Sequence, residues 1–228
     1  RNGWYGPKKY FYVENFENAF ANFHNRKYAL MTPNCTTAIH LLLTSLGISE
    51  GDEVILPECT WIATGAGISY LRATPIFCDI DSENWCLDPH SVEKRITAKT
   101  KAVIAVDLFG NMPHYDKLID LCAHHHIPLI EDAAEAVGSI YKGKRAGKFG
   151  IGSVFSFHRT KTITTGEGGM LLLDDKHLYE RSMFLRDHGR GDSMYFNSEV
   201  TYKYMPFNVQ AALGYAQFQR IEELVKWK

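Results

Sequence analysis

The sequence has no excess of either charge, little glycine or proline, and no long hydrophobic run. Its 228 residues carry 25 Lys and Arg against 26 Asp and Glu, a formal net charge of −1. Because both signs are scattered along the chain, no basic stripe can follow a phosphate backbone, and we expect no nucleic-acid partner. The 18 glycines and 8 prolines are too few for a collagen or a disordered linker.

Membrane and secretory signals are also missing. No apolar run approaches the roughly 20 residues that a membrane-spanning helix needs. Residues 1–4 lack the apolar stretch of a secretory signal. The five cysteines are odd in number and have no C-x-x-C spacing, which argues against a disulfide framework or a thiolate zinc site. We therefore expect a cytoplasmic protein with no membrane contact.

What is present is an alternation of short apolar runs and helical patterns. Strands separated by helices are typical of crossover units in a parallel sheet. The order predicts an α/β fold of three layers, with helices on both faces of a mostly parallel central sheet. The expected strands are 28–31, 53–56, 75–78, 102–106, 128–131, 154–157 and 169–173. The expected helices are 13–23, 38–46, 61–71, 89–96, 114–124, 177–186 and 208–225.

The alternation is interrupted twice. Residues 138–152 are polar and contain several glycines, which predicts a loop or ribbon. Residues 189–204 are polar, aromatic and aperiodic, which predicts a flexible loop. With no internal repeat and no linker, we expect residues 1–228 to form one domain.

Two turns after predicted strands hold polar residues that are suited to ligands. In residues 34–38, Asn-Cys-Thr-Thr-Ala, backbone N–H groups at a helix start form an anion site, although Asn34 or Thr36 could simply cap the helix. Asp132 follows a predicted strand, at the edge where ligands of open α/β sheets gather. Its carboxylate could hold a metal, accept a proton, pair with a heterocyclic N–H, or only begin a helix.

Lys161 lies among hydroxyl-bearing residues and glycines, with apolar strands on either side. Desolvation lowers the pKa of an amine and makes it nucleophilic, as Schiff-base chemistry requires; a solvated turn lysine is the alternative. The segment lacks the G-x-x-x-x-G-K-[ST] order of a nucleotide-binding P-loop, which excludes that class of site. The three consecutive histidines 124–126 cannot all face one ion, so we expect no metal site.

Together these features match the requirements of a pyridoxal phosphate site. The cofactor needs a phosphate cradle, a surface that stacks on its ring, a carboxylate for its pyridine nitrogen and a lysine for the aldimine. The turn at 34–38, Trp61, Asp132 and Lys161 supply these four parts in that order.

Longer motifs make a resemblance specific. Residues 131–136 (Glu-Asp-Ala-Ala-Glu-Ala) and 155–170, which surround Asp132 and Lys161, resemble the sugar aminotransferases of the DegT/DnrJ/EryC1/StrS family, within the fold-type I aminotransferases. The perosamine-synthase-like members, which act on nucleotide-linked keto-sugars, are the most similar. The resemblance runs in family order from Gly3 to the last helix, with further matches at 51–55, 74–77, 107–110 and 208–214.

The resemblance implies a role for each matching residue. Lys161 carries the internal aldimine and moves the proton between the cofactor and the sugar carbon. Asp132 pairs with the pyridine nitrogen, and Trp61 stacks on the ring. Glu135, where many relatives have Gln or His, lies near the 3-hydroxyl group of the cofactor or near the substrate. The phosphate is expected to bind Cys35, Thr36, Ser156 and, across a homodimer with shared active sites, Asn208 of the partner subunit.

The same resemblance implies an aspartate-aminotransferase-like large domain, with the family's small C-terminal domain missing after Lys228. It also implies transfer of an amino group from an amino acid, by family habit L-glutamate, through pyridoxamine phosphate to a nucleotide-linked keto-sugar, for O-antigen or polysaccharide biosynthesis. Two alternatives stay open. A pyridoxamine-dependent sugar dehydratase of this fold has histidine in place of Lys161, and a non-catalytic homologue would bind cofactor or sugar without turnover.

Overall fold

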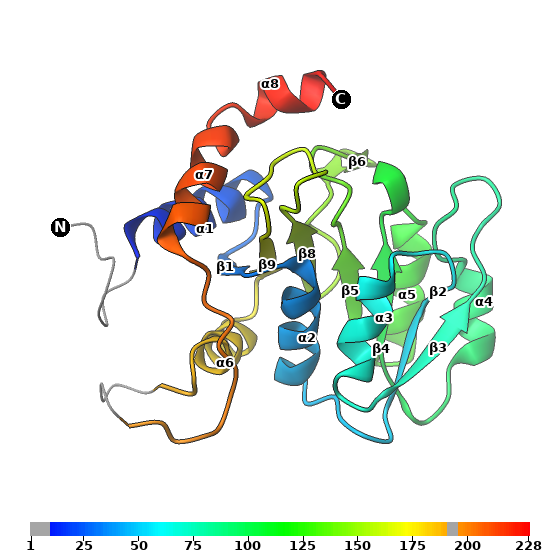
Figure 1. Ribbon diagram of the computed structural model, residues 1–228. Helices are drawn as coiled ribbons and strands as arrows, with labels where there is room; N and C mark the ends of the chain where they lie inside the picture. Colours follow the sequence, from blue (N-terminus) through cyan, green and yellow to red (C-terminus); the bar gives the residue numbers. More distant parts are fainter. Residues whose placement is uncertain (1–9, 191–195) are drawn as a thin grey trace.

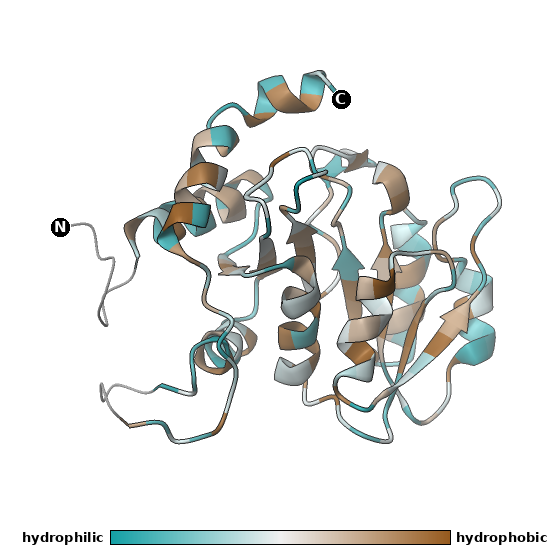
Figure 2. Cartoon of the chain, viewed as in Figure 1, coloured by the Kyte–Doolittle hydropathy of each residue, from teal (hydrophilic) through white to brown (hydrophobic). Residues whose placement is uncertain are grey.

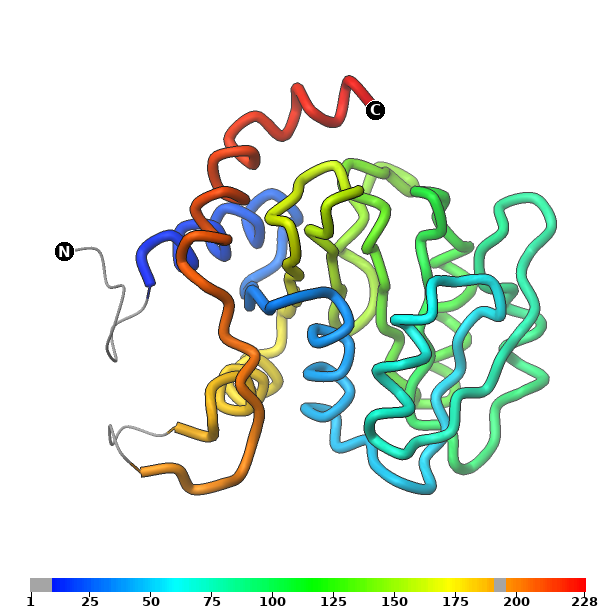
Figure 3. The backbone as a smooth tube through the Cα atoms, viewed as in Figure 1, coloured from blue at the N-terminus to red at the C-terminus, as the bar shows by residue number. Residues whose placement is uncertain are grey.

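The computed structural model describes residues 10–190 and 196–228, and its chain path can be followed in Figure 3. Residues 1–4, the Gly3 end of the resemblance and part of the predicted loop 189–204 lie outside the described residues. All five cysteines are described and free. No helix in the described part of the chain is long and apolar enough to cross a membrane.

Seven strands form the main sheet. Across the sheet they are β1 (Tyr28–Thr32), β9 (Gly169–Leu173), β8 (Gly152–Ser156), β5 (Leu129–Asp132), β4 (Thr100–Val106), β2 (Glu53–Pro57) and β3 (Thr74–Cys78). Neighbours from β8 to β3 pair in parallel, while β9 runs antiparallel to both β8 and β1. The predicted, mostly parallel sheet is therefore confirmed. A two-stranded ribbon of β6 (Ile140–Tyr141) and β7 (Lys144–Arg145) lies within the predicted loop or ribbon 138–152.

Helices cover both faces of this sheet, which confirms the three-layer α/β architecture (Figure 1). One face carries α2 (Cys35–Ser45), α3 (Ile62–Ser69) and α6 (Lys176–Arg186). The other face carries α1 (Phe11–Phe23), α7 (Asn208–Phe218) and α8 (Ile221–Lys226) over one half, and α4 (Pro89–Arg95) and α5 (Tyr115–His124) over the other.

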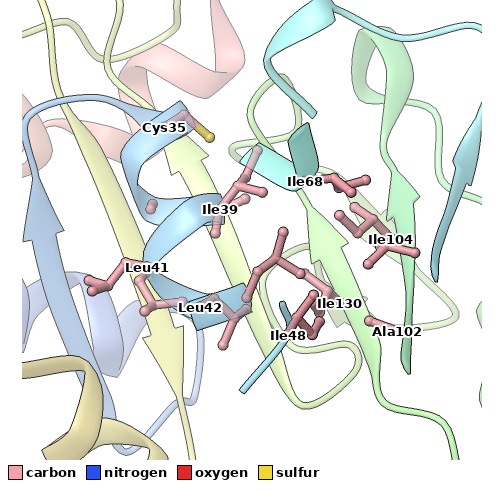
Figure 4. Packing of buried hydrophobic residues seen from close by; sticks show 14 of the residues in the cluster. Cys35, Ile39, Leu41, Leu42, Ile48, Ile68, Ala102, Ile104 and Ile130 are labelled. Carbon is pink, nitrogen blue, oxygen red and sulfur yellow. The ribbon is translucent and has the colours of Figure 1, made fainter. Parts of the chain in front are cut away.

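Successive side chains along each strand point to opposite faces of the sheet, so one sheet contributes residues to two hydrophobic layers. In β9, Leu171 and Leu173 pack toward α2, whereas Met170 and Leu172 pack toward α1. Such strands read as continuous apolar runs because both of their faces are buried, and the hydrophobic residues gather along the sheet in Figure 2. Figure 4 shows the α2 side of this packing, with Ile39 and Leu42 of the helix near Ile130 of β5.

Most predicted helices agree with the structure to within two residues, and two differ by more. Helix α2 begins at Cys35 rather than at residue 38, because Asn34 caps it. The single helix predicted over 208–225 is wrong, because the chain turns at Gln219 and Arg220 and forms α7 and α8. The turn returns the apolar side chain of Ile221 to the core that α1 and α7 share.

Candidate active site

A cavity of about 580 Å³ opens where the parallel strands end. The loops after β1, β2, β4, β5 and β8 all reach it, because the carboxyl ends of parallel strands meet at one edge of the sheet. Seven of the eight predicted site residues line this cavity, namely Cys35, Thr36, Trp61, Asp132, Glu135, Ser156 and Lys161. The lining also includes residues that the sequence did not single out, among them Thr64, Phe109, His158 and Glu167.

The start of α2 forms one end of the cavity. The Oδ1 atom of Asn34 accepts the N–H of Thr37 at 2.9 Å, so Asn34 is the cap and Thr36 is not. The N–H groups of Cys35 and Thr36 have no acceptor inside the helix and can meet an anion, so capping and anion binding are compatible. Burial raises the pKa of the Cys35 thiol well above its ordinary value, which leaves its backbone as the useful group.

A close approach fixes this helix start against the sheet. A Cβ atom added to Gly169, the first residue of β9, would lie 2.5 to 2.6 Å from the backbone of Asn34 and Cys35. No side chain fits that gap. Glycine at position 169 therefore lets the first turn of α2 lie directly beside the strand.

Asp132 is a buried carboxylate at the end of β5, only 4% exposed. Its Oδ2 accepts the Thr64 hydroxyl at 2.8 Å, and its Oδ1 accepts the N–H of Ala134 at 3.2 Å. Burial raises the pKa of Asp132, although both hydrogen bonds and the Lys161 ammonium oppose this rise. A buried carboxylate of this kind favours a cationic partner in the cavity. Thr64 carries no sequence signature that distinguishes it from other helix-forming threonines.

Lys161 forms an ion pair that the sequence did not predict. Its Nζ lies 3.0 Å from Oε1 of Glu135, and the two side chains are only 20% and 30% exposed. The other oxygen, Oε2, accepts the backbone N–H of Phe109 at 2.8 Å. Burial acts to raise the pKa of Glu135, but the Phe109 N–H and Lys161 together hold it below its ordinary value. The partial burial expected for Lys161 is thus present, with a counter-charge beside it.

The loop that carries Lys161 is held by α7 and by a residue that follows α8. Gln217 of α7 donates to the carbonyl of Thr164 at 2.6 Å and accepts its N–H at 3.1 Å. Lys228, just after α8, donates to the hydroxyl of Thr162 at 3.1 Å. These contacts join residues more than 50 positions apart, which no local pattern could predict.

The remaining predicted residues described by their contacts are Trp61, Ser156 and Asn208, and each lies in a different environment. Trp61 is the N-cap residue of α3, and it is 77% exposed at the cavity. The Oγ of Ser156 accepts the N–H of His158 at 3.3 Å. Asn208 lies outside the cavity lining, and its Oδ1 accepts the N–H of Tyr12, which joins α7 to α1. Its role across a dimer stays a prediction.

Histidines 124–126 are exposed at the end of α5. In residues 10–190 and 196–228, no group of three or more His, Cys, Asp or Glu side chains is arranged to hold a metal ion.

The residues around the cavity fit pyridoxal phosphate. Free N–H groups at a helix start suit its phosphate, the Asp132 carboxylate suits a protonated pyridine nitrogen, and the Lys161 amine suits its aldehyde. Trp61 offers an exposed ring at the same cavity. The volume lies within the range of roughly 300 to 1,000 Å³ that is usual for cofactor and ligand sites.

Comparison with known proteins agrees with this geometry. The DegT/DnrJ/EryC1/StrS aminotransferase family matches residues 1–228, which is the whole chain. The chain belongs to this family. It is 44% identical over 218 residues to the GDP-perosamine synthase of Escherichia coli O157:H7, a match covering 95% of this chain and 60% of that relative.

Solved structures of other proteins share the fold. The aminotransferase from Psychrobacter cryohalolentis matches with a TM-score of 0.90 and 32% identity, over 93% of this chain and 57% of that one. A GDP-4-keto-6-deoxymannose-3-dehydratase with bound GDP-perosamine matches with a TM-score of 0.88 and 27% identity, over 94% and 62% of the two chains. The chain therefore spans about 60% of the length of these relatives.

Proposed function

We propose that residues 1–228 are the cofactor-binding large domain of a pyridoxal phosphate-dependent aminotransferase. Its amino donor is an amino acid, L-glutamate, and its acceptor is a nucleotide-linked keto-sugar. The observation that carries the proposal is one cavity at the ends of the parallel strands that holds both the buried Asp132 and the amine of Lys161. Family membership supports the class of reaction, and the name of the Escherichia coli relative supports a GDP-sugar as the first acceptor to try.

The chain's own residues would divide the work among them. When bound, pyridoxal phosphate supplies an aldehyde that takes up the amino group and a ring that stores an electron pair. Asp132 would keep the ring nitrogen protonated, and the start of α2 with Ser156 would hold the phosphate. Trp61 would cover the ring, and Lys161 would hold and move the proton at its Nζ atom.

Two alternatives to the aminotransferase are a sugar dehydratase and a non-catalytic homologue. Lys161 argues against the sugar dehydratase, because dehydratases of this kind have histidine in place of this lysine. A non-catalytic homologue could also bind the cofactor through Lys161, so the response of the bound cofactor to L-glutamate separates this alternative from an aminotransferase.

Amino transfer can be tested in two steps. The purified protein is loaded with pyridoxal phosphate, and L-glutamate is added while the visible absorption of the cofactor is followed. We expect this absorption to disappear with release of 2-oxoglutarate, and to return when an accepting GDP-linked keto-sugar is added. Binding of the cofactor with no spectral response to any amino acid would favour the non-catalytic homologue.

The proposed homodimer with shared sites has its own test. Lys161→Ala and Asn208→Ala homodimers should both be impaired, the former far more severely. Mixing the two variants after reversible dissociation should restore activity toward half the wild-type level per heterodimer, because one site then has both residues. Activity equal to the mean of the parents would mean that Asn208 serves its own subunit. Retention of cofactor on dialysis gives a second readout.

A further inference from the structure

Glu135 makes contacts that its expected place near the cofactor hydroxyl or the substrate does not explain. One carboxylate oxygen, Oε1, lies 3.0 Å from the Lys161 ammonium, and the other, Oε2, accepts the Phe109 N–H at 2.8 Å. Both oxygens are therefore engaged with the protein before any ligand is considered. The side chain is two-thirds buried, so solvent weakens the pair less than it would on an open surface.

The turn that supplies the Phe109 N–H is unusual and well fixed. Phe109 has φ of +55° and Gly110 has φ of +84°, the left-handed conformation that is costly for a residue with a Cβ. Ser139 donates its hydroxyl to the Gly110 carbonyl at 2.8 Å. Leu108, the first residue of the turn, is buried. Strained backbone that is fixed in this way clusters at functional sites.

We propose that Glu135 is a positioning residue that pairs with the Lys161 ammonium whenever the amine is not bound to the cofactor, and that the Phe109 N–H holds Glu135 for this task. The inference rests on the proposed function, because it concerns the proton that Lys161 is proposed to move. In the ion pair, the amine carries that proton at a fixed place instead of exchanging it freely with solvent. Glu135 thus acts through Lys161, whose amine it contacts, and not directly on the carbon from which the proton is moved.

Other groups also face this pair. The Asp132 carboxylate also interacts electrostatically with the Lys161 ammonium. The Lys228 ammonium, just after α8, interacts electrostatically with Glu135. Around the same cavity stand the titratable side chains of Cys35, Cys59, His158 and Glu167. Within residues 10–190 and 196–228, only Glu135 forms an ion pair with Lys161.

Competitive acetylation of the cofactor-free protein tests the role. Trace acetic anhydride modifies only uncharged amines, and mass spectrometry gives a rate against pH for each lysine. Glu135→Gln keeps the volume and an acceptor for the Phe109 N–H but removes the charge. We expect the Lys161 profile to move to lower pH by about one unit, roughly a tenfold faster reaction near pH 7.5.

Matched variants separate this effect from a loss of structure. Glu167→Gln neutralises another cavity carboxylate, which lies 3.6 Å from His158, and should leave the Lys161 profile unchanged. Glu135→Asp keeps the charge and should restore much of the wild-type profile. An unmoved Lys161 profile in Glu135→Gln, or an equal movement of every lysine, would overturn the proposal.

A second readout keeps this inference apart from the proposed function. Borohydride reduction after loading with pyridoxal phosphate shows whether Lys161 binds the cofactor at all. A pyridoxyl label on Lys161 with an unmoved acetylation profile refutes only the role of Glu135. A moved profile with no label on Lys161 supports the ion pair and refutes the proposed function.

Discussion

Glu131 and Asp132 are neighbouring carboxylates on β5, and the pleat of the strand sends them to opposite faces of the sheet. Glu131 is fully buried and accepts the N–H groups of Gly147 at 2.7 Å and Phe149 at 2.9 Å. Asp132 is nearly as buried, but it borders the cavity that also holds Lys161. One carboxylate is enclosed by its own chain, and the other is available to a ligand.

Burial alone therefore does not mark a functional acid. Burial raises the pKa of both carboxyl groups, and it raises that of Asp107, which faces Glu131, still more clearly. What separates them is access. Asp107, Glu131 and Tyr115 form a closed group whose hydrogen bonds are made within the protein. One oxygen of Asp107, Oδ2, has no hydrogen-bond partner, and a proton shared with Glu131 can satisfy it. Asp132 keeps one side toward the cavity.

The largest expected effect is on stability. Glu131→Ala would leave the buried N–H groups of Gly147 and Phe149 without an acceptor, and we expect a loss of about 4 kcal/mol in the free energy of unfolding. Asp132→Ala should lose less than about 1 kcal/mol, because water in the cavity can replace it. Urea unfolding of both variants measures this contrast. Equal losses would remove the distinction between the closed and the open carboxylate.

Activity should show the opposite order. We expect Asp132→Asn to retain cofactor but to lose on the order of 10²-fold in the half-reaction with glutamate, the scale for removing a positioned charge partner. The physical reason is that an amide cannot keep the pyridine nitrogen protonated. Stopped-flow spectroscopy gives the rate. A near wild-type rate would leave the carboxylate only a structural role, as the acceptor of the Thr64 hydroxyl and the Ala134 N–H.

The wall of the cavity offers a smaller structural test. Gly169→Ala would place a Cβ within 2.6 Å of the Asn34 and Cys35 backbone, so we expect a loss of about 2 kcal/mol and weaker binding of the cofactor phosphate. Gly65→Ala in α3 is the matched control, because its Cβ would meet only Leu56 at an ordinary 3.6 Å. Thermal melts and cofactor titration compare the two. Equal stability and equal cofactor affinity in the two variants would show that α2 can move away from β9 without weakening the fold or the phosphate site.

The closed carboxyl pair should also appear in the pH dependence. Because burial raises the pKa of Asp107 and Glu131, the folded protein keeps a proton that the unfolded chain releases near pH 4, so this contribution to stability is lost as pH rises. We expect the free energy of unfolding of the wild type to fall by about 1.4 kcal/mol per pH unit between pH 5 and 7, when it is measured relative to that of Asp107→Asn. His24, whose pKa burial lowers to about 3, affects both proteins equally. Parallel curves would mean that the pair holds no extra proton.

Much of this arrangement could be predicted because it follows from local pattern. Apolar strands that end in polar turns placed Cys35 and Asp132 at one edge of the sheet, where the cavity lies, and the family resemblance added Ser156. Contacts between distant segments could not be predicted in this way. The bond from Thr64 to Asp132 and the clamp of Gln217 on the Lys161 loop depend on how helices pack, as does the break between α7 and α8.

The central claim is that Lys161 is the amine that meets the cofactor in this cavity. The direct measurement is borohydride reduction of the protein loaded with pyridoxal phosphate, followed by peptide mapping. We predict a pyridoxyl label on Lys161 that is abolished in Lys161→Ala. A label on Lys148, which is paired with Asp174, or on the exposed Lys176 would contradict it.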